Sequence, residues 1–286
     1  MISIPQAIIL GLLQGFSELF PISSLGHSVI LPGLLGWNIQ RDNPSFLPFL
    51  VATHLATAIV LLGFFWRDWV AILMGLGRSL RDRAINETDP QAKLGWLLVV
   101  GTIPAGIIGL LFQKPLESLF ASAQIAAFFL MLNGLLLYGA EVLRRKAKEN
   151  TPDTESDARI AKMSWMQAVI VGTVQTIALI PGFSRSGATM GGSLLVGLSH
   201  EDSARFSFLL ATPIIGAAAA LKIPELFVPG GGNAILLPAI IGAICSGVTA
   251  YLSVKFLMKY FRSNTLTPFA IYCGAAGAAL SLYFLK

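Results

Sequence analysis

Two short polar segments interrupt long apolar stretches, and each one holds an ionisable side chain. The first reads QGFSELFPISSLGH over residues 14–27, and the second reads PGFSRSGAT over residues 181–189. Of the 15 acidic residues, Glu18 lies clearly inside an apolar segment, and Arg185 is the basic residue at the second interruption. Burying a charge in a membrane segment is expensive, so such residues usually have a function. We expect Glu18 and Arg185 to meet, with a purely structural ion pair as the less favoured alternative.

The residues around Glu18 point to two kinds of chemistry. Gln14 and Glu18 are four residues apart and share one helix face, where two oxygen donors suit a hard cation such as Mg²⁺ or Ca²⁺. Ser24 and His27 follow the interruption at a spacing of three, and a hydroxyl beside an imidazole is typical of an activated nucleophile. The alternatives are that Ser24 only caps a helix and that His27 only bonds a carbonyl.

The residues around Arg185 favour an anion. Its guanidinium matches phosphate, neighbouring glycines let the backbone approach a ligand, and a helix that starts after the interruption adds N–H groups. The residues expected to bind the anion are Ser23, Gly26, Gly182, Ser184, Ser186, Gly187 and Thr189. His54 and Gln175 are expected to support the residues that touch the substrate. The N-terminal ends of the two helices that follow the interruptions, together with Arg185 and a cation, would make a pocket for a diphosphate.

Composition excludes a soluble protein. The chain has 286 residues, of which 55% are hydrophobic and 12% are charged, with a mean hydropathy of +0.72. Soluble domains contain about 25% charged residues, and disordered chains are more polar still. The net charge of +5 does not indicate nucleic acid, because the basic residues gather in short loops between apolar runs, as in cytoplasmic membrane loops.

The apolar runs are of two kinds. Six are long enough to cross a bilayer as helices: 46–66, 94–113, 122–143, 204–223, 234–258 and 267–285. Two others, 4–36 and 166–198, are broken in the middle by proline or glycine. The arm 5–20 would form only about 24 Å of helix, which is too short to cross. We therefore expect 4–36 and 166–198 to be re-entrant helical hairpins, with their polar turns buried in protein.

The two halves of the chain resemble each other at an offset of 161 residues. Six of the 22 positions from Ala7 to Ser28 are identical to their counterparts in the second half. This predicts an all-α polytopic membrane protein made of two repeats, 1–145 and 164–286, joined by a cytoplasmic linker, 146–163. A hairpin plus three spans crosses the membrane an odd number of times, so the repeats must be inverted. In that topology 14 of the 20 Lys and Arg residues lie on one side, which the positive-inside rule makes cytoplasmic, and both termini lie outside.

Both motifs resemble the signatures of the undecaprenyl-diphosphate phosphatase family, the bacitracin-resistance membrane phosphatases. The resemblance extends over nearly the whole chain and includes SFLLATP at 207–213 and FAIY at 269–272. It implies hydrolysis of a polyprenyl diphosphate to the monophosphate, which recycles the carrier lipid for peptidoglycan synthesis and gives bacitracin resistance. It also implies a divalent cation and a site open to the outer side of the bacterial plasma membrane; a homodimer is a further expectation. Carried over by motif, the catalytic residues are Glu18, Ser24, His27 and Arg185. Gln14 stands where some members carry Glu.

Two questions stay open at this point. Either Ser24 attacks the phosphorus with His27 as base, or His27 attacks directly, while Glu18 binds the cation or orients His27. The alternative function is a polyprenyl-phosphate transporter or flippase, which would need the same anion site but no nucleophile.

Overall fold

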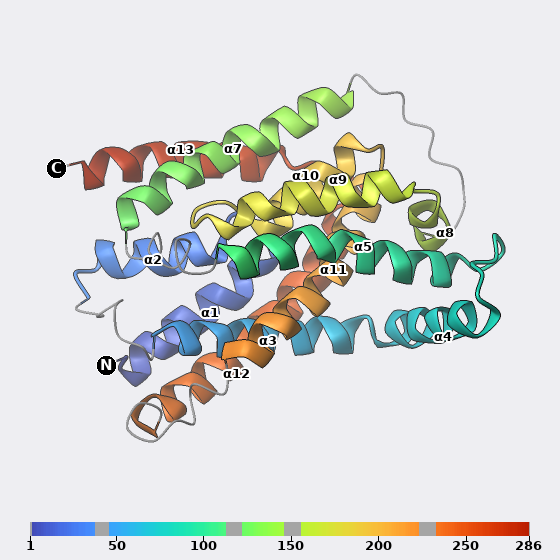
Figure 1. The fold of residues 1–286 in the computed structure, drawn as a ribbon. Coiled ribbons are helices and arrows are strands. Elements are labelled where there is room, and N and C mark those ends of the chain that lie inside the picture. Colours follow the sequence, from blue (N-terminus) through green and yellow to red (C-terminus); the bar gives the residue numbers. More distant parts are fainter. Residues whose placement is uncertain (1, 38–45, 113–121, 146–155, 223–232, 286) are drawn as a thin grey trace.

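The computed structural model describes residues 2–37, 46–112, 122–145, 156–222 and 233–285, and these parts are helical with no strand (Figure 1). Five of their helices are long and apolar enough to span a membrane, or six if the bent pair α3–α4 is one span. The expected all-α polytopic membrane architecture is therefore confirmed. The helices are α1 (Ile4–Leu19), α2 (Ser24–Leu34), α3 (Phe46–Phe64), α4 (Trp66–Asp82), α5 (Pro90–Leu111), α7 (Ala123–Arg145), α8 (Ser156–Ala161), α9 (Trp165–Gln175), η1 (Thr176–Leu179), α10 (Arg185–Leu195), α11 (His200–Lys222), α12 (Asn233–Tyr260) and α13 (Thr267–Phe284).

The two broken segments form pairs of short helices, α1–α2 and α9–α10. Both α1 and α9 begin with the same capping box, in which Ser3 and Gln6, or Ser164 and Gln167, exchange side-chain and backbone hydrogen bonds. Both α2 and α10 begin directly after a serine N-cap. The internal similarity of the sequence therefore reappears as matching helix ends, while the inverted relation of the two halves and their boundaries stay predictions.

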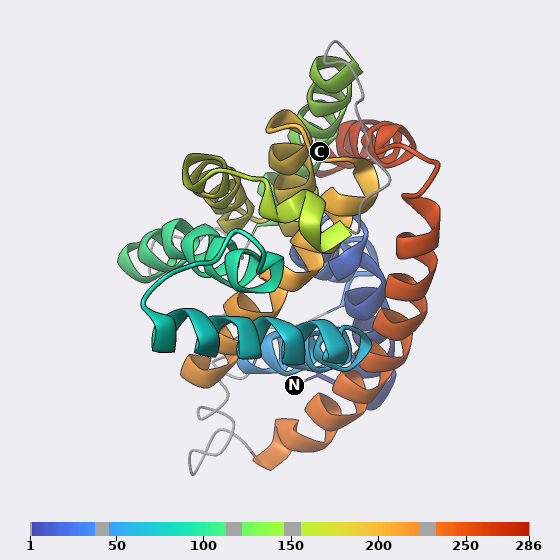
Figure 2. The same cartoon turned by 90° about the vertical axis from the view of Figure 1, so that its right-hand side faces the viewer.

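Each hairpin packs against a span from the other half of the chain. Helix α1 lies on α12, and α9 lies on α5. The contacts are close because glycines meet there: a Cβ on Gly11 would lie 2.3 Å from the carbonyl oxygen of Gly242, and a Cβ on Gly172 would lie 2.3 Å from that of Gly101. Helices α7 and α13 lie side by side in both views (Figures 1 and 2). These contacts between the two halves of the chain bring the two polar turns together.

One long helix was not expected from the sequence, besides the short α8 in the predicted linker. The first span ends at Phe64, and the chain bends by 80° into α4, over residues that the sequence analysis treats as a loop. This helix is strongly amphipathic, with charged residues such as Arg67, Asp68 and Arg78 among apolar ones. A helix of that kind is suited to a membrane surface, not to a crossing.

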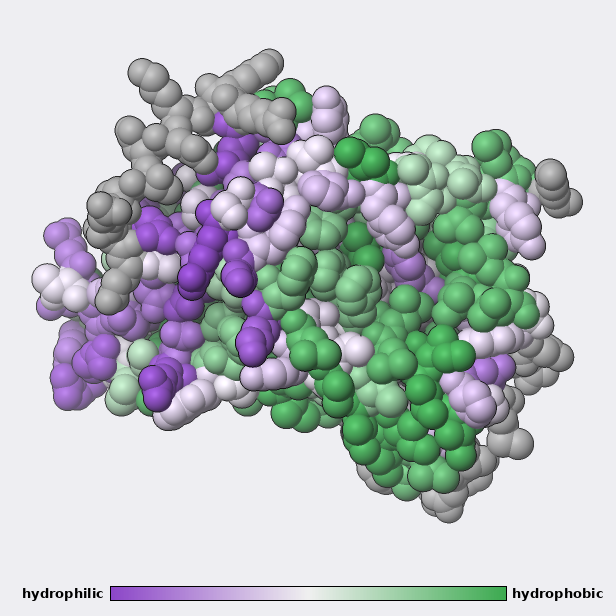
Figure 3. All heavy atoms as spheres, turned by 180° about the vertical axis from the view of Figure 1, so that it is seen from behind, coloured by the Kyte–Doolittle hydropathy of each residue, from purple (hydrophilic) through white to green (hydrophobic). Residues whose placement is uncertain are grey.

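The molecule has one charged end. Hydrophilic side chains gather at the end that includes α4, the start of α5 and α8, whereas the rest of the visible surface is largely apolar (Figure 3). The N- and C-termini lie at the opposite end (Figure 1). Of the expected linker, 146–155 lies outside the described residues, and α8 is tied to α11 by ion pairs from Arg159 to Asp202 at 2.7 Å and from Arg205 to Asp157 at 2.8 Å.

Candidate active site

The carboxylate of Glu18, near the end of α1, is the centre of a polar cluster and is only 5% exposed. Its Oε1 accepts hydrogen bonds from Nη2 and Nε of Arg185, at 2.9 and 3.3 Å. Its Oε2 accepts from Oγ of Ser24 at 2.5 Å and from Nε2 of Gln14 at 2.9 Å, and Nε2 of His54 lies 3.2 Å away. The structure thus brings Glu18, Ser24, Arg185 and Gln14 together, and places His54 in direct contact with Glu18.

Electrostatics explain why this carboxylate tolerates burial. The C-terminal end of a helix is unfavourable for a negative charge. Here the guanidinium of Arg185 compensates, and Ser24 and Arg185 are the first residues of α2 and α10, whose N-terminal ends carry positive partial charge. Nδ1 of His54 lies 2.7 Å from the carbonyl oxygen of Leu50. Because a carbonyl oxygen only accepts, we assign a proton to Nδ1, which donates it to this bond.

The serines before the two helices are matched N-caps. Oγ of Ser23 accepts from the N–H of Gly26, and Oγ of Ser184 accepts from the N–H of Gly187, both at 3.1 Å. Ser23 has φ of 70°, an unusual conformation for a residue with a side chain. These hydroxyls hold the helix starts, and through them the positions of Ser24 and Arg185.

Glycines let the two turns touch. Gly182 has φ of 105°, and a Cβ on it would lie 2.3 Å from the carbonyl oxygen of Ala126 in α7. A Cβ on Gly26 would lie 3.0 Å from Cα of Gly182, and one on Gly187 would lie 3.3 Å from Cβ of Pro21. Their role in the structure is therefore close packing of the turns against each other and against α7.

The remaining predicted polar residues bond to groups other than Glu18, on the backbone and on neighbouring side chains. Ser186 donates to the carbonyl oxygen of Phe20 at 3.1 Å, which joins the second turn to the first. Thr189 donates to the carbonyl oxygen of Arg185 at 2.7 Å and lies 3.3 Å from Oε1 of Gln175. These contacts support the turns, and none of them includes Glu18.

His27 is engaged elsewhere. Its Nδ1 lies 2.7 Å from the carbonyl oxygen of Ser23, and its Nε2 lies 2.8 Å from the hydroxyl of Tyr272 on α13. The two rings stack with centroids 5.8 Å apart. Both ring nitrogens therefore have partners, and the structure pairs Ser24 with Glu18 and His27 with Tyr272 in place of the expected contact between Ser24 and His27.

Two residues that contact these turns, Tyr272 and Asn133, were not predicted from the sequence as part of the site. Tyr272 belongs to the FAIY segment, which was noted only as part of the family resemblance. Asn133 in α7 is fully buried and bonds both turns. The signal for Asn133 was available, because an amide stands alone among apolar residues in that span, and such groups need partners.

Two buried polar atoms of the cluster lack partners among the described residues: Nη1 of Arg185 and Oε1 of Gln14. Among the residues that the structure describes, no group of three or more His, Cys, Asp or Glu side chains is arranged to hold a metal ion. Glu18 and Oε1 of Gln14 are oxygen donors of the kind that Mg²⁺ and Ca²⁺ take, and Mg²⁺ often completes its shell with substrate phosphates. The residues therefore fit a cation that arrives with a diphosphate.

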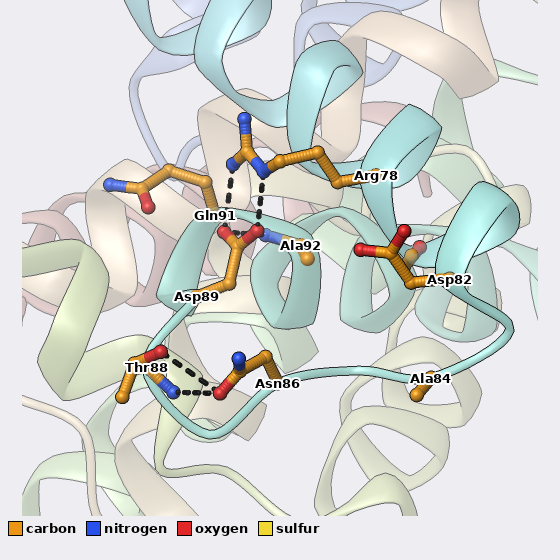
Figure 4. A pocket seen from close by; sticks show the side chains of 9 residues that line it. Arg78, Asp82, Ala84, Asn86, Thr88, Asp89, Gln91 and Ala92 are labelled. Atoms are coloured by element: carbon orange, nitrogen blue, oxygen red, sulfur yellow. Dashed lines mark hydrogen bonds and ion pairs between the residues drawn. The ribbon is translucent and has the colours of Figure 1, made fainter.

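A separate pocket of about 330 Å³ lies at the charged end, between α4 and α5 (Figure 4). There Arg78 donates two hydrogen bonds to Asp89, at 2.8 and 3.0 Å, and Asp89 also caps α5 through the N–H of Ala92. These contacts connect α4 to the start of α5, and none of them includes Glu18.

Comparison with known proteins identifies the family. The family model for the bacitracin resistance protein BacA matches residues 7–279. The chain is 48% identical to an undecaprenyl-diphosphatase of Mycolicibacterium paratuberculosis, over 97% of this chain and 96% of the relative. It is 46% identical to undecaprenyl-diphosphatase 2 of Chromobacterium violaceum, over 98% of each. A cluster centred on Glu18 and Arg185 therefore sits in the two signature segments of a chain that belongs to the BacA bacitracin resistance family.

Proposed function

We propose that this chain is an integral membrane phosphatase that hydrolyses undecaprenyl diphosphate to undecaprenyl phosphate and inorganic phosphate. This reaction recycles the lipid carrier for peptidoglycan synthesis and gives bacitracin resistance. The observation that carries the proposal is the shared carboxylate of Glu18, which holds the hydroxyl of Ser24 and the guanidinium of Arg185 side by side. Relatives that bear the name undecaprenyl-diphosphatase, and that match nearly the whole chain, support it.

Arg185 binds the terminal phosphate. Its buried Nη1 has no partner among the described residues, so it has hydrogen atoms to donate while Nη2 and Nε stay on Glu18. A guanidinium matches phosphate in shape and charge, and the N-terminal ends of α2 and α10 favour the same anion. Arg185 thus orients the phosphate and offsets the charge that develops in the transition state.

Ser24 is the nucleophile that this geometry favours. Its Oγ attacks the terminal phosphorus, the bond from phosphorus to the bridging oxygen breaks, and polyprenyl monophosphate leaves. The proton of the hydroxyl passes to Oε2 of Glu18, which lies 2.5 Å away, and from there to the departing monophosphate, so that Glu18 is again a carboxylate. His27 is less well placed to attack, because its Nε2 is bonded to Tyr272.

Hydrolysis of the phosphoserine completes the reaction. Water attacks the phosphorus, the bond between phosphorus and Oγ breaks, and Ser24 recovers a proton, so that inorganic phosphate is released. Glu18 is the nearest described carboxylate to accept the proton of the water and return it. A divalent cation, Mg²⁺ or Ca²⁺, held by Glu18 and Oε1 of Gln14, supplies neutralising charge to the diphosphate when it is bound.

The proposed location is the bacterial plasma membrane, with the site open to the outer side. The charged end of the molecule, opposite both termini, supports a cytoplasmic position for that end (Figure 3). In this orientation both termini lie outside. Labelling single cysteines placed at Ser3 and Glu87 in intact cells tests the orientation, since only the first should react with an impermeant reagent. The homodimer stays a prediction, which light scattering of the purified protein tests.

Phosphate release from undecaprenyl diphosphate in detergent tests the function. We expect release by the wild type with Mg²⁺ or Ca²⁺, and a loss of at least a hundredfold in Ser24→Ala and Arg185→Ala. Substrate labelled at the terminal phosphorus should leave the label on Ser24 after an acid quench. Protein that binds the lipid but releases no phosphate, with or without a cation, would contradict the proposal and favour a transporter.

A further inference from the structure

Asn133 lies between the two turns, on a helix that belongs to neither hairpin. Its Nδ2 donates to the carbonyl oxygen of Pro21, in the turn between α1 and α2, at 3.0 Å. Its Oδ1 accepts from the backbone N–H of Ser184, in the turn before α10, at 3.0 Å. The side chain is 0% exposed, so water does not compete for these bonds. One amide therefore joins segments that are more than 160 residues apart in sequence.

The orientation of this amide follows from its partners. A carbonyl oxygen only accepts and a backbone N–H only donates, so Nδ2 must face Pro21 and Oδ1 must face Ser184. The second hydrogen of Nδ2 points to Sγ of Cys273, 3.3 Å away on α13. A side chain with only donors or only acceptors would lose its bond to one of the two turns.

The helix that carries Asn133 is firmly placed. A Cβ on Gly134 would lie 2.5 Å from the backbone nitrogen of Gly274, so α7 and α13 are in close backbone contact at this glycine. Gly182 of the second turn packs on the carbonyl oxygen of Ala126 in α7, at the distance that only glycine allows. The close packing of α7 thus fixes the position of Asn133, to which both turns are bonded.

We propose that Asn133 is a positioning residue, which sets Ser24 and Arg185 at the correct separation across Glu18. Pro21 lies three residues before Ser24, and Ser184 directly precedes Arg185, so a shift at either bond moves a group that acts on the phosphate. The inference rests on the proposed phosphatase function. A displacement of about 1 Å in an active site can reduce a rate on the order of a hundredfold.

Two variants separate the bonds. Asn133→Leu has nearly the same shape and loses both, whereas Asn133→Asp keeps an oxygen that accepts from the N–H of Ser184. We expect kcat for phosphate release to fall about 10- to 100-fold in Asn133→Leu, with KM within about twofold, because substrate contacts remain and their alignment is lost. Asn133→Asp should have a kcat between that of Asn133→Leu and that of the wild type.

A matched control removes a hydrogen bond between two other helices, away from the candidate active site. Ser79 is 7% exposed, and its hydroxyl accepts from Nε1 of Trp96 at 2.9 Å, which joins α4 to α5 at the charged end. Ser79→Ala should lower the thermal unfolding midpoint and leave kcat within about twofold of the wild type. If Asn133→Leu behaves in the same way, Asn133 has only a structural role and the proposal is wrong.

Hydrogen exchange at the Ser184 amide measures the bond directly. We expect this amide to be protected in the wild type and in Asn133→Asp, and to exchange at least tenfold faster in Asn133→Leu. Equal exchange in the wild type and Asn133→Leu would overturn the inference, whatever the rates of catalysis. A wild type without phosphatase activity would instead refute the proposed function, and the exchange measurement alone would then decide whether Asn133 holds the turn.

Discussion

Ser24 and Arg185 donate to opposite oxygens of one carboxylate, and each is the first residue of a short helix that follows a turn. They are 161 residues apart, the same offset that relates the two halves of the sequence. Equivalent places in the two hairpins thus carry different chemistry, a hydroxyl in one and a guanidinium in the other. Glu18 is what keeps these unlike groups beside each other.

Arg185 should require a planar guanidinium and not only a positive charge. Arg185→Lys keeps the charge but cannot hold Glu18 through two nitrogens and present a third to phosphate. We expect kcat/KM to fall at least a hundredfold in Arg185→Lys, nearly as far as in Arg185→Ala. The control is Arg81→Ala, whose side chain is 74% exposed and which should be fully active. Recovery of more than a tenth of wild-type activity in Arg185→Lys would contradict this.

His54 should contribute a hydrogen bond to Glu18, which Nε2 donates in the imidazolium form because Nδ1 already donates to the carbonyl oxygen of Leu50. Losing one bond to a charged group costs about 1.5 kcal/mol, which corresponds to about a tenfold lower kcat for His54→Ala. His54→Gln retains an N–H donor of similar reach and should recover most of the rate. Steady-state kinetics of both variants test this, and full activity of His54→Ala would show that the contact is dispensable.

Gln14 should control the response to cations. Gln14→Glu adds a second carboxylate one helix turn from Glu18, so the concentration of Mg²⁺ or Ca²⁺ for half-maximal phosphate release should fall about tenfold. The matched control is Gln175→Glu, at the equivalent position of the second half, which should leave the cation dependence unchanged. Titration of chelator-treated enzyme with each cation measures the effect. An unchanged midpoint in Gln14→Glu would exclude Gln14 as a ligand.

Gly182 and Gly197 offer a test of the contact between the turns. Their φ angles are 105° and 102°, but a Cβ would clash with α7 only at Gly182, whereas Gly197 has open space around it. Gly197→Ala should lower the free energy of unfolding by about 1 kcal/mol and leave kcat unchanged. Gly182→Ala should lower both, because the second turn must move away from α7. Thermal unfolding in detergent, together with kcat, distinguishes the two; equal behaviour would argue against a functional need for that contact.

Acid should weaken the connection between α4 and α5. Hydrogen bonds from Arg78 hold the pKa of Asp89 below its ordinary value (Figure 4). The folded state therefore gains stability from ionised Asp89 above the ordinary pKa of about 4, and loses it as the pH falls through the lowered pKa. Asp89→Asn retains a helix cap but should flatten this part of the unfolding curve against pH. Asp82→Asn, on an exposed pair with Arg81, is the control and should change the curve little.

Local patterns were sufficient for the helices and for the choice of residues. Long apolar runs predict α5, α7, α11, α12 and α13 to within four residues at each described end, because the length of a crossing is set by the bilayer. Proline and glycine predict the breaks in the hairpins, where they stand beside polar residues, because both are unfavourable in a helix interior. Prolines inside otherwise apolar runs, such as Pro104 and Pro213, did not end α5 or α11. Glu18 and Arg185 could be singled out because they are charged residues inside apolar segments. Burying a charge there costs free energy whatever the fold is. Helix α4 was not predicted, because the search for membrane spans looks for long apolar runs, and this amphipathic segment contains several charged residues.

The partners of the buried polar groups depended on packing between distant segments. Ser24 and His27 are close in sequence, yet Ser24 donates to Glu18 and His27 bonds Tyr272, 245 residues away. His54 and Asn133 reach the turns only because α3 and α7 lie beside them. A hydrogen bond is decided by direction and by distances of a few tenths of an ångström, which residue order does not specify. The amino-acid order therefore determines which groups must be paired, and the arrangement of the helices in space decides which partner each one takes.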